Sequence, residues 1–172
     1  MFARFAGCNL ACPWCDTDVR PRFELALEDL VREIAGFRAK SVILTGGEPT
    51  LVKEMPALVA ALKAKGYWIA VETNGTNAPE WLGDIDYVAC SPKVEYADRI
   101  VLARADEVRV VASSANVLGF CRTVRERIVA TYYYVSPCER NGDIDFATAK
   151  DVLGKLEGWS LSVQLHKVLG FR

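Results

Sequence analysis

The chain has 172 residues, of which 51% are hydrophobic and 25% are charged, and its formal net charge is −1. This length suits one domain with a substantial core, so residues 1–172 are expected to form a single domain. The balanced charge argues against a nucleic-acid-binding protein that relies on electrostatics, and no apolar run approaches the roughly 20 residues that span a bilayer.

Apolar periodicity predicts strands and helices in alternation. In chain order, the pattern predicts a strand at 2–6, a helix at 26–38, a strand at 41–44, a helix at 53–65, strands at 67–72, 86–90 and 107–112, a helix at 115–125, a strand at 128–135, a helix at 146–156 and a last strand at 161–165. This alternation is typical of βαβ units and a mostly parallel sheet. A full eight-unit barrel needs about 250 residues, so the expected fold class is α/β, an open partial (β/α)6-type barrel of about six strands.

Unusual polar motifs follow five of the predicted strands. They are the cysteine-bearing loop at 8–17, Thr45-Gly46-Gly47-Glu48-Pro49, Glu72-Thr73-Asn74-Gly75, Cys90-Ser91-Pro92-Lys93 and Gln164-Leu165-His166-Lys167. In α/β sheets and barrels, ligands bind at the carboxyl ends of the strands. The five motifs therefore predict one shared site at that edge.

Three cysteines, Cys8, Cys12 and Cys15, are spaced Cys-x3-Cys-x2-Cys. Four thiolates would close a [4Fe–4S] cluster, whereas three leave one iron open. The amino and carboxylate groups of S-adenosylmethionine (SAM) can chelate that iron. The spacing alone also allows a structural zinc site with His166, the only histidine, although zinc ligands usually come in close pairs.

The other cysteines, Cys90, Cys121 and Cys138, are scattered singly and are expected to be structural, because a buried cysteine behaves as a small hydrophobe. Only seven residues precede Cys8, and they contain no long apolar stretch, so no signal peptide is expected. The cytoplasm is then the default location, and a tight cysteine cluster in a reducing compartment suggests a metal centre.

Residues 5–17, Phe-Ala-Gly-Cys-Asn-Leu-Ala-Cys-Pro-Trp-Cys-Asp-Thr, resemble the signature of the radical SAM superfamily. More narrowly, the chain resembles the 7-carboxy-7-deazaguanine synthase family. That match depends on Trp-Cys-Asp-Thr at 14–17, on the motifs at 45–49, 72–76 and 90–93, and on Gln-Leu-His-Lys at 164–167. The resemblance therefore extends from residue 4 to residue 167.

The resemblance implies a lyase that contracts the ring of 6-carboxy-5,6,7,8-tetrahydropterin to 7-carboxy-7-deazaguanine, with loss of ammonia, in queuosine-precursor biosynthesis. The implied cofactors are one [4Fe–4S] cluster, SAM and Mg²⁺. An electron donor such as flavodoxin or ferredoxin and a homodimeric state are also implied, with no nucleic-acid or membrane partner.

The resemblance also implies residue roles. The cluster ligands are Cys8, Cys12 and Cys15, and Thr17 binds Mg²⁺. The implied SAM contacts are Trp14, Asp16, Gly46, Gly47, Glu48, Thr73, Asn74, Ser91, Pro92, Lys93 and Gln164. The implied substrate contacts are Arg4, Thr45, Glu72 and His166, of which Glu72 and His166 are the catalytic candidates.

Several of these residues also have a plainer interpretation. Gly46-Gly47 suits an ordinary turn, Glu72 suits a capping or turn role, Lys93 suits a solvated surface and a lone histidine is more often structural. Two other functions stay open: a small activase that takes hydrogen from a partner protein, and a non-enzymatic iron–sulfur or zinc module.

The predicted first strand begins at Phe2, which leaves no residues for the Gly-Glu-Gly-like upstream loop that the family uses against the pterin ring. Two alternatives stay open: the true start lies upstream of Met1, or the chain is a shortened variant with a different lid. The expectation for residues 1–172 is a chain that binds the cluster and cleaves SAM but converts the pterin poorly.

Overall fold

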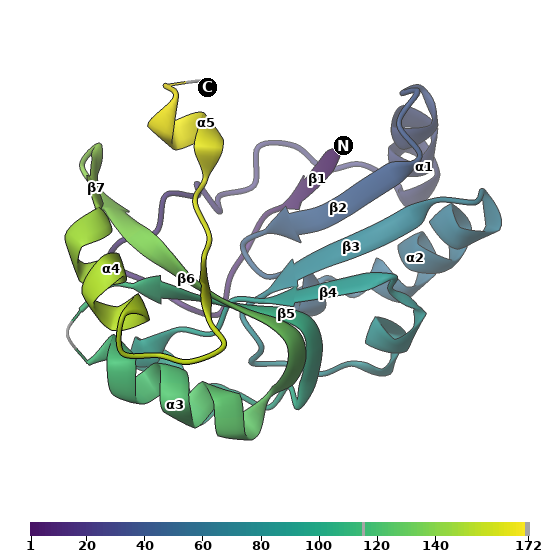
Figure 1. Cartoon of the computed structure of the whole chain (residues 1–172). Helices are drawn as coiled ribbons and strands as arrows, with labels where there is room; N and C mark the ends of the chain where they lie inside the picture. The colour runs from purple at the N-terminus through teal and green to yellow at the C-terminus, as the bar shows by residue number, and fades with distance from the viewer. Residues whose placement is uncertain (115, 171–172) are drawn as a thin grey trace.

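The structure is a computed structural model that describes residues 1–114 and 116–170. Its centre is one curved sheet, in which six parallel strands follow one another in chain order (Figure 1). They are β1 (Phe2–Phe5), β2 (Ser41–Gly46), β3 (Trp68–Thr73), β4 (Tyr87–Cys90), β5 (Arg104–Ala112) and β6 (Val129–Arg140). β8 (Ser160–Leu161) pairs parallel with β6, and β7 (Asp143–Asp145) pairs with it antiparallel. No ladder within the described residues joins β1 to the last strands, so the barrel is open and the predicted fold class is confirmed.

The longer helices lie outside the curved sheet (Figure 1). They are α1 (Leu27–Ala35), α2 (Met55–Ala64), α3 (Val117–Arg127) and α4 (Phe146–Leu153). A short α5 (Leu165–Val168) and the 3-10 turns η1 (Pro49–Leu51), η2 (Glu80–Asp84) and η3 (Val94–Arg99) lie in the connections. α1 shows why these segments are helical: Val31 and Ile34 share one buried face, and Glu28 and Asp29 favour the positive end of the helix dipole.

The two faces of the sheet differ in polarity. On β5, Val108 and Val110 are buried in the apolar core between the sheet and the helices. Glu107 and Arg109 alternate with them and therefore point to the opposite, inner face. The strands thus place polar groups inside the open barrel, near the loops at their carboxyl ends.

The predicted last strand at 161–165 is wrong. β8 ends at Leu161, and Leu165 already belongs to α5. The reason is local: the carbonyl of Gln164 accepts hydrogen bonds from the amides of Lys167 and Val168, which is helical bonding. The motif at 164–167 therefore lies on a short helix rather than at a strand end.

The β6–β7 hairpin was missed, although Asn141-Gly142 is a strong hairpin signal. Both residues have positive φ (54° and 89°), as a type I′ turn requires. The helix predicted at 115–125 is observed as α3, and its expected first residue, Ala115, lies outside the described residues. Among the described helices, none is both long and apolar enough to cross a membrane.

Candidate active site at the carboxyl ends of the strands

The three clustered cysteines lie on the loop that leaves β1. Cys8 and Cys12 are partly exposed, Cys15 is exposed, and all three are free thiols. The amide of Gly7 donates to the carbonyl of Val19 at 2.7 Å, which closes the base of the loop. The donor set is thus three accessible thiols on one loop, the chemistry that a three-cysteine iron–sulfur cluster requires. We call residues 7–19 the cluster loop.

Polar contacts from the β3–β4 connection hold the first half of the cluster loop. Asn9 donates to the hydroxyl of Thr76 at 2.7 Å and accepts from the side chain of Asn74 at 3.0 Å. The implied SAM contact Asn74 is therefore also an anchor of the loop. Asn9 itself carried no signal in the sequence beyond its place between two cysteines.

The turn η3 holds the same loop from a second side. The amide of Ala11 donates to the hydroxyl of Tyr96 at 3.1 Å, and Arg99 donates to the carbonyl of Asn9 at 3.0 Å. The indole of Trp14 donates to Glu95 at 3.0 Å. Sequence reasoning missed this role of η3, because its residues look like ordinary surface residues.

The two glycines at the end of β2 let the backbone pass close to the end of β1 and the start of the cluster loop. Gly46 has φ +133°, and a Cβ there would lie 2.1 Å from the carbonyl oxygen of Phe5. A Cβ on Gly47 would lie 1.8 Å from the carbonyl oxygen of Gly7. The amides of Gly47 and Glu48 donate to those same two carbonyls at 3.0 and 2.9 Å. Any side chain here would push the cluster loop away from β2.

Glu48 is fully buried and joins the ends of β2 and β3. Its Oε1 accepts from the amide and hydroxyl of Thr50 (3.1 and 2.6 Å) and from the hydroxyl of Thr73 (2.8 Å). Its Oε2 accepts from the amide of Asn74 at 2.6 Å. Four donors from the chain satisfy a carboxylate that would otherwise be costly to bury. The structure therefore gives Glu48, Thr73 and Asn74 a shared internal role.

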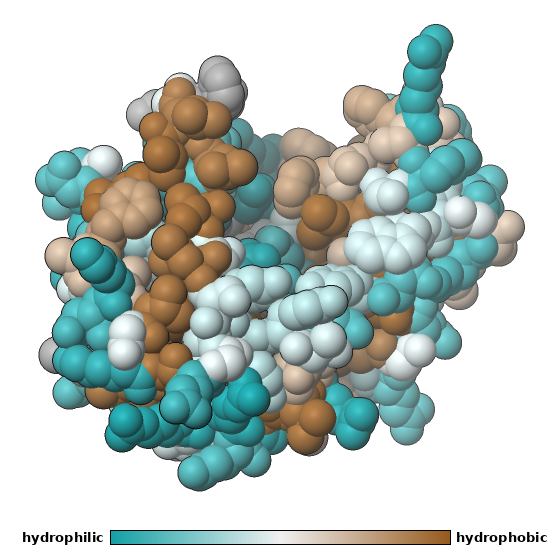
Figure 2. Space-filling model, viewed as in Figure 1, coloured by the Kyte–Doolittle hydropathy of each residue, from teal (hydrophilic) through white to brown (hydrophobic). Residues whose placement is uncertain are grey.

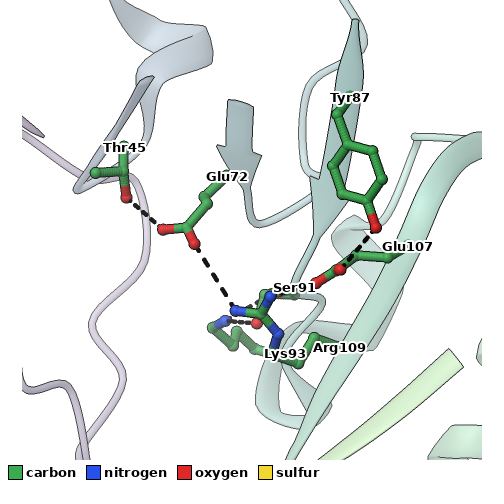
Figure 3. A network of polar contacts seen from close by, with 7 residues as sticks. All are labelled: Thr45, Glu72, Tyr87, Ser91, Lys93, Glu107 and Arg109. Carbon is green, nitrogen blue, oxygen red and sulfur yellow. Dashed lines mark hydrogen bonds and ion pairs between the residues drawn. The ribbon is translucent and has the colours of Figure 1, made fainter. Parts of the chain in front are cut away.

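A second polar group lies on the inner face of the sheet (Figure 3). The hydroxyl of Thr45 donates to Glu72 at 2.7 Å, and Arg109 Nη1 lies 3.7 Å from the other oxygen of Glu72. Arg109 also pairs with Glu107, whose second oxygen accepts from the hydroxyl of Tyr87 at 2.9 Å. Burial and this hydrogen bond to Glu107 raise the pKa of Tyr87 well above its ordinary value, so Tyr87 stays a donor.

Sequence reasoning missed Arg109 and Glu107. The available signal was the alternation of charged residues with valines along β5, which is unusual in a parallel sheet because its strands are usually buried on both faces. Arg4, in contrast, was expected, and the register pairs it with Thr45 on the neighbouring strand. Arg4 is exposed and extends the row of Thr45 and Glu72 by one strand.

The motif after β4 contacts the cluster loop through Lys93. Its ammonium donates to the carbonyl and the hydroxyl of Ser91, both at 2.6 Å, and lies 5.6 Å from the ring centroid of Trp14. Burial lowers the pKa of Lys93. Pro92, which lies between Ser91 and Lys93 in the sequence, is buried. The plainer interpretation of Lys93, a solvated surface lysine, is thus not observed, and its proposed contact with SAM stays a prediction.

The end of the cluster loop meets the C-terminal segment. Thr17 donates to Asp16 at 3.2 Å, and the other oxygen of Asp16 pairs with Lys167. Lys167 also pairs with Glu139 at 2.7 Å. Burial opposes both charges, but their shared hydrogen bond lowers the pKa of Asp16 and raises the pKa of Lys167.

Gln164 and His166 lie on this C-terminal segment. Gln164 is the N-cap of α5, and His166 is exposed in its first turn. The described contacts include no side-chain hydrogen bond of His166. The structure therefore brings its neighbour Lys167, rather than His166 itself, into contact with the cluster loop.

Within residues 1–114 and 116–170, no three His, Cys, Asp or Glu side chains converge as ligands for a single metal ion. A mononuclear zinc site needs that convergence, because its sulfur and nitrogen ligands lie about 2.0–2.3 Å from one ion. An iron–sulfur cluster spaces its thiolates more widely.

Comparison with solved structures shows the fold. QueE from Escherichia coli matches with a TM-score of 0.72 at 21% identity, over 95% of this chain and 84% of that one. SuiB from Streptococcus suis, bound to its precursor peptide SuiA, matches with a TM-score of 0.60 at 12% identity, over 94% of this chain and 48% of that one. Both likenesses agree with the predicted fold, an open α/β barrel with mostly parallel strands.

Comparison with known sequences shows the family. The radical SAM superfamily model matches residues 3–128. The 7-carboxy-7-deazaguanine synthase of Neisseria meningitidis serogroup B is 41% identical over 181 residues, covering 99% of this chain and 84% of that protein. The enzyme of the same name from Haemophilus influenzae is 38% identical over 179 residues, covering 99% and 83%. The chain therefore belongs to the radical SAM superfamily and, within it, to the 7-carboxy-7-deazaguanine synthase family, as its motifs predicted.

Proposed function

We propose that this chain contracts the ring of 6-carboxy-5,6,7,8-tetrahydropterin to 7-carboxy-7-deazaguanine, with loss of ammonia. The observation that carries the proposal is the junction of two sites at one sheet edge. The start of the cluster loop packs directly on Gly47 and Glu48, and the nearby Thr45 donates to Glu72 on the inner face. A radical generated at the loop would therefore arise beside the polar row that faces the interior.

The cysteine loop fits a [4Fe–4S] cluster on Cys8, Cys12 and Cys15. With SAM bound, such a cluster would supply the radical chemistry needed to remove hydrogen from the substrate carbon that bears the carboxylate. The chain's own part is to bind SAM and exclude competing reactions. The residues proposed for SAM are Trp14, Asp16, Gly46, Gly47, Glu48, Thr73, Asn74, Ser91, Pro92, Lys93 and Gln164.

Other residues would bind and orient the substrate. Arg4 offers a planar fork of donors to the substrate carboxylate, on the strand next to Thr45. Thr45 and Glu72 would contact the ring, and Glu72 would accept or transfer a proton. His166 would reach the substrate from α5.

Magnesium, the reductant and the assembly also belong to the proposal. Thr17 would give Mg²⁺ one neutral oxygen, which suits an ion that keeps most of its waters and takes few protein ligands. The ion would orient the substrate carboxylate. The family also supports a flavodoxin or ferredoxin as electron donor, a homodimer, and the cytoplasm as the setting.

The experiment is anaerobic reconstitution of the cluster, followed by SAM, dithionite and the tetrahydropterin, with mass spectrometry of the products. We expect 7-carboxy-7-deazaguanine without any partner protein, and SAM recovered rather than consumed. Cys12→Ala is the inactive control, and Cys121→Ala, a buried cysteine of α3, is the matched active control. Slow conversion would agree with the expected poor turnover, whereas cleavage of SAM with no 7-carboxy-7-deazaguanine detected would contradict the proposal and favour an activase.

A further inference from the structure

One lysine joins three separate parts of the chain at the rim of the site. Lys167 of α5 pairs with Asp16 of the cluster loop, 151 positions away, and with Glu139 near the end of β6. Asp16 lies between Cys15 and Thr17. Through Asp16, the ammonium group of Lys167 therefore links the segment of Cys15 and Thr17 to the C-terminal helix α5. Through Glu139, the same group links that segment to the sheet.

Apolar packing does not hold α5 in place. None of its four residues is buried, and Leu165 and Leu169 are 66% and 60% exposed. Figure 2 shows the corresponding apolar strip along the C-terminal segment, facing outward. The helix is also far too short to be stable alone. Its attachment to the rest of the molecule must therefore come from polar contacts, of which the pairs of Lys167 are prominent.

The pair differs from an ordinary surface ion pair in its burial. The side chain of Lys167 is 19% exposed, whereas Lys155, which pairs with Asp151 on α4, is 53% exposed. Charges that are partly removed from water interact more strongly than exposed ones, which contribute little. Without Lys167, Asp16 and Glu139 would lose the cation that both of them contact, and their repulsion would push the loop from β6.

We propose that Lys167 is a positioning residue that holds the Cys15–Thr17 end of the cluster loop in one conformation. It acts through Asp16 and Glu139 and touches neither substrate nor cofactor. The loop up to Trp14 has its own anchors on Thr76 and η3, and Val19 is bonded to Gly7, so the Cys15–Thr17 end is the part that depends on this contact. The inference goes beyond the proposed function, since it holds whatever the substrate is.

The test is hydrogen–deuterium exchange of the apo protein, followed by mass spectrometry. Lys167→Met keeps the length of the side chain and removes its charge, Lys167→Arg keeps the charge, and Lys155→Met is the control on an exposed pair. In Lys167→Met, we expect exchange in peptides covering 12–19 and 160–170 to accelerate about tenfold, with exchange in α2 unchanged. Lys167→Arg should restore protection, because a guanidinium can bridge two carboxylates.

A second measurement follows the reconstituted protein. The magnesium concentration that gives half-maximal activity should rise several-fold in Lys167→Met and return in Lys167→Arg. Three results would each overturn the inference: unchanged exchange at 12–19 in Lys167→Met, equal acceleration in α2, or a Lys167→Arg variant as mobile as Lys167→Met. Exchange is measured without cluster or substrate, so its outcome does not depend on the proposed reaction.

Discussion

Replacing Glu48 by glutamine tests whether this carboxylate is an internal brace. The side chain is fully buried, and each of its oxygens accepts one backbone amide: Oε1 from Thr50 and Oε2 from Asn74. The hydroxyls of Thr50 and Thr73 can rotate to accept a hydrogen bond, but the backbone amides cannot. Whichever way the glutamine amide is turned, its NH2 group must therefore face one backbone N–H.

The expected loss of stability follows from this one unpaired backbone N–H group. One buried donor left without an acceptor costs about 1–3 kcal/mol, and the remaining bonds lose the extra strength of a charged acceptor. We expect Glu48→Gln to lower the free energy of unfolding by about 2–3 kcal/mol, which for a chain of this size is roughly 5–10 °C in Tm.

The assay is urea unfolding of the apo protein followed by circular dichroism, with SAM affinity measured separately on the reconstituted protein. The matched control is Glu54→Gln, an exposed glutamate at the N-cap of α2 without a side-chain capping bond. It should change stability by no more than about 0.5 kcal/mol. If Glu48→Gln were as stable as the control while SAM affinity collapsed, Glu48 would be a direct SAM ligand and the brace argument would fail.

Further predictions concern the cluster loop and its surroundings. Cys12→Ala should lose cluster iron, sulfide and brown absorbance, whereas Cys121→Ala should keep them; iron analysis showing the reverse would give a different ligand set. Burial raises the pKa of Cys121 to about 12, so only about one in ten thousand of its thiols is ionised at pH 8 and native alkylation should be very slow, which rapid labelling would refute. Thr17→Ala should weaken the dependence of turnover on magnesium while leaving SAM affinity nearly intact, and indifference to magnesium in the unmodified protein would defeat this claim. Gly47→Ala should destabilise the fold by several kcal/mol and reduce cluster loading, because its Cβ would overlap the cluster loop, whereas Gly83→Ala, which meets no atom within 4 Å, should be near neutral in thermal melts.

The sequence by itself determined the features that neighbouring residues encode. The spacing of Cys8, Cys12 and Cys15 indicated the cluster, and apolar periodicity located most of the strands and helices. Motifs at strand ends also predicted a common edge for the site, because parallel strands direct their carboxyl ends to one side. Periodicity works over a few positions, which is the range in which a strand or a helix repeats.

Only the tertiary structure decided which distant side chains meet. The pairing of Arg109 with Glu72 depends on the register and curvature of three strands, and the bond between Asn9 and Asn74 depends on how two loops fold over one edge. Lys167 meets Asp16 only because α5 replaces the last part of the predicted strand and turns toward the cluster loop. Such contacts are set by the packing of whole helices, strands and loops, so no local pattern in a single sequence predicts them.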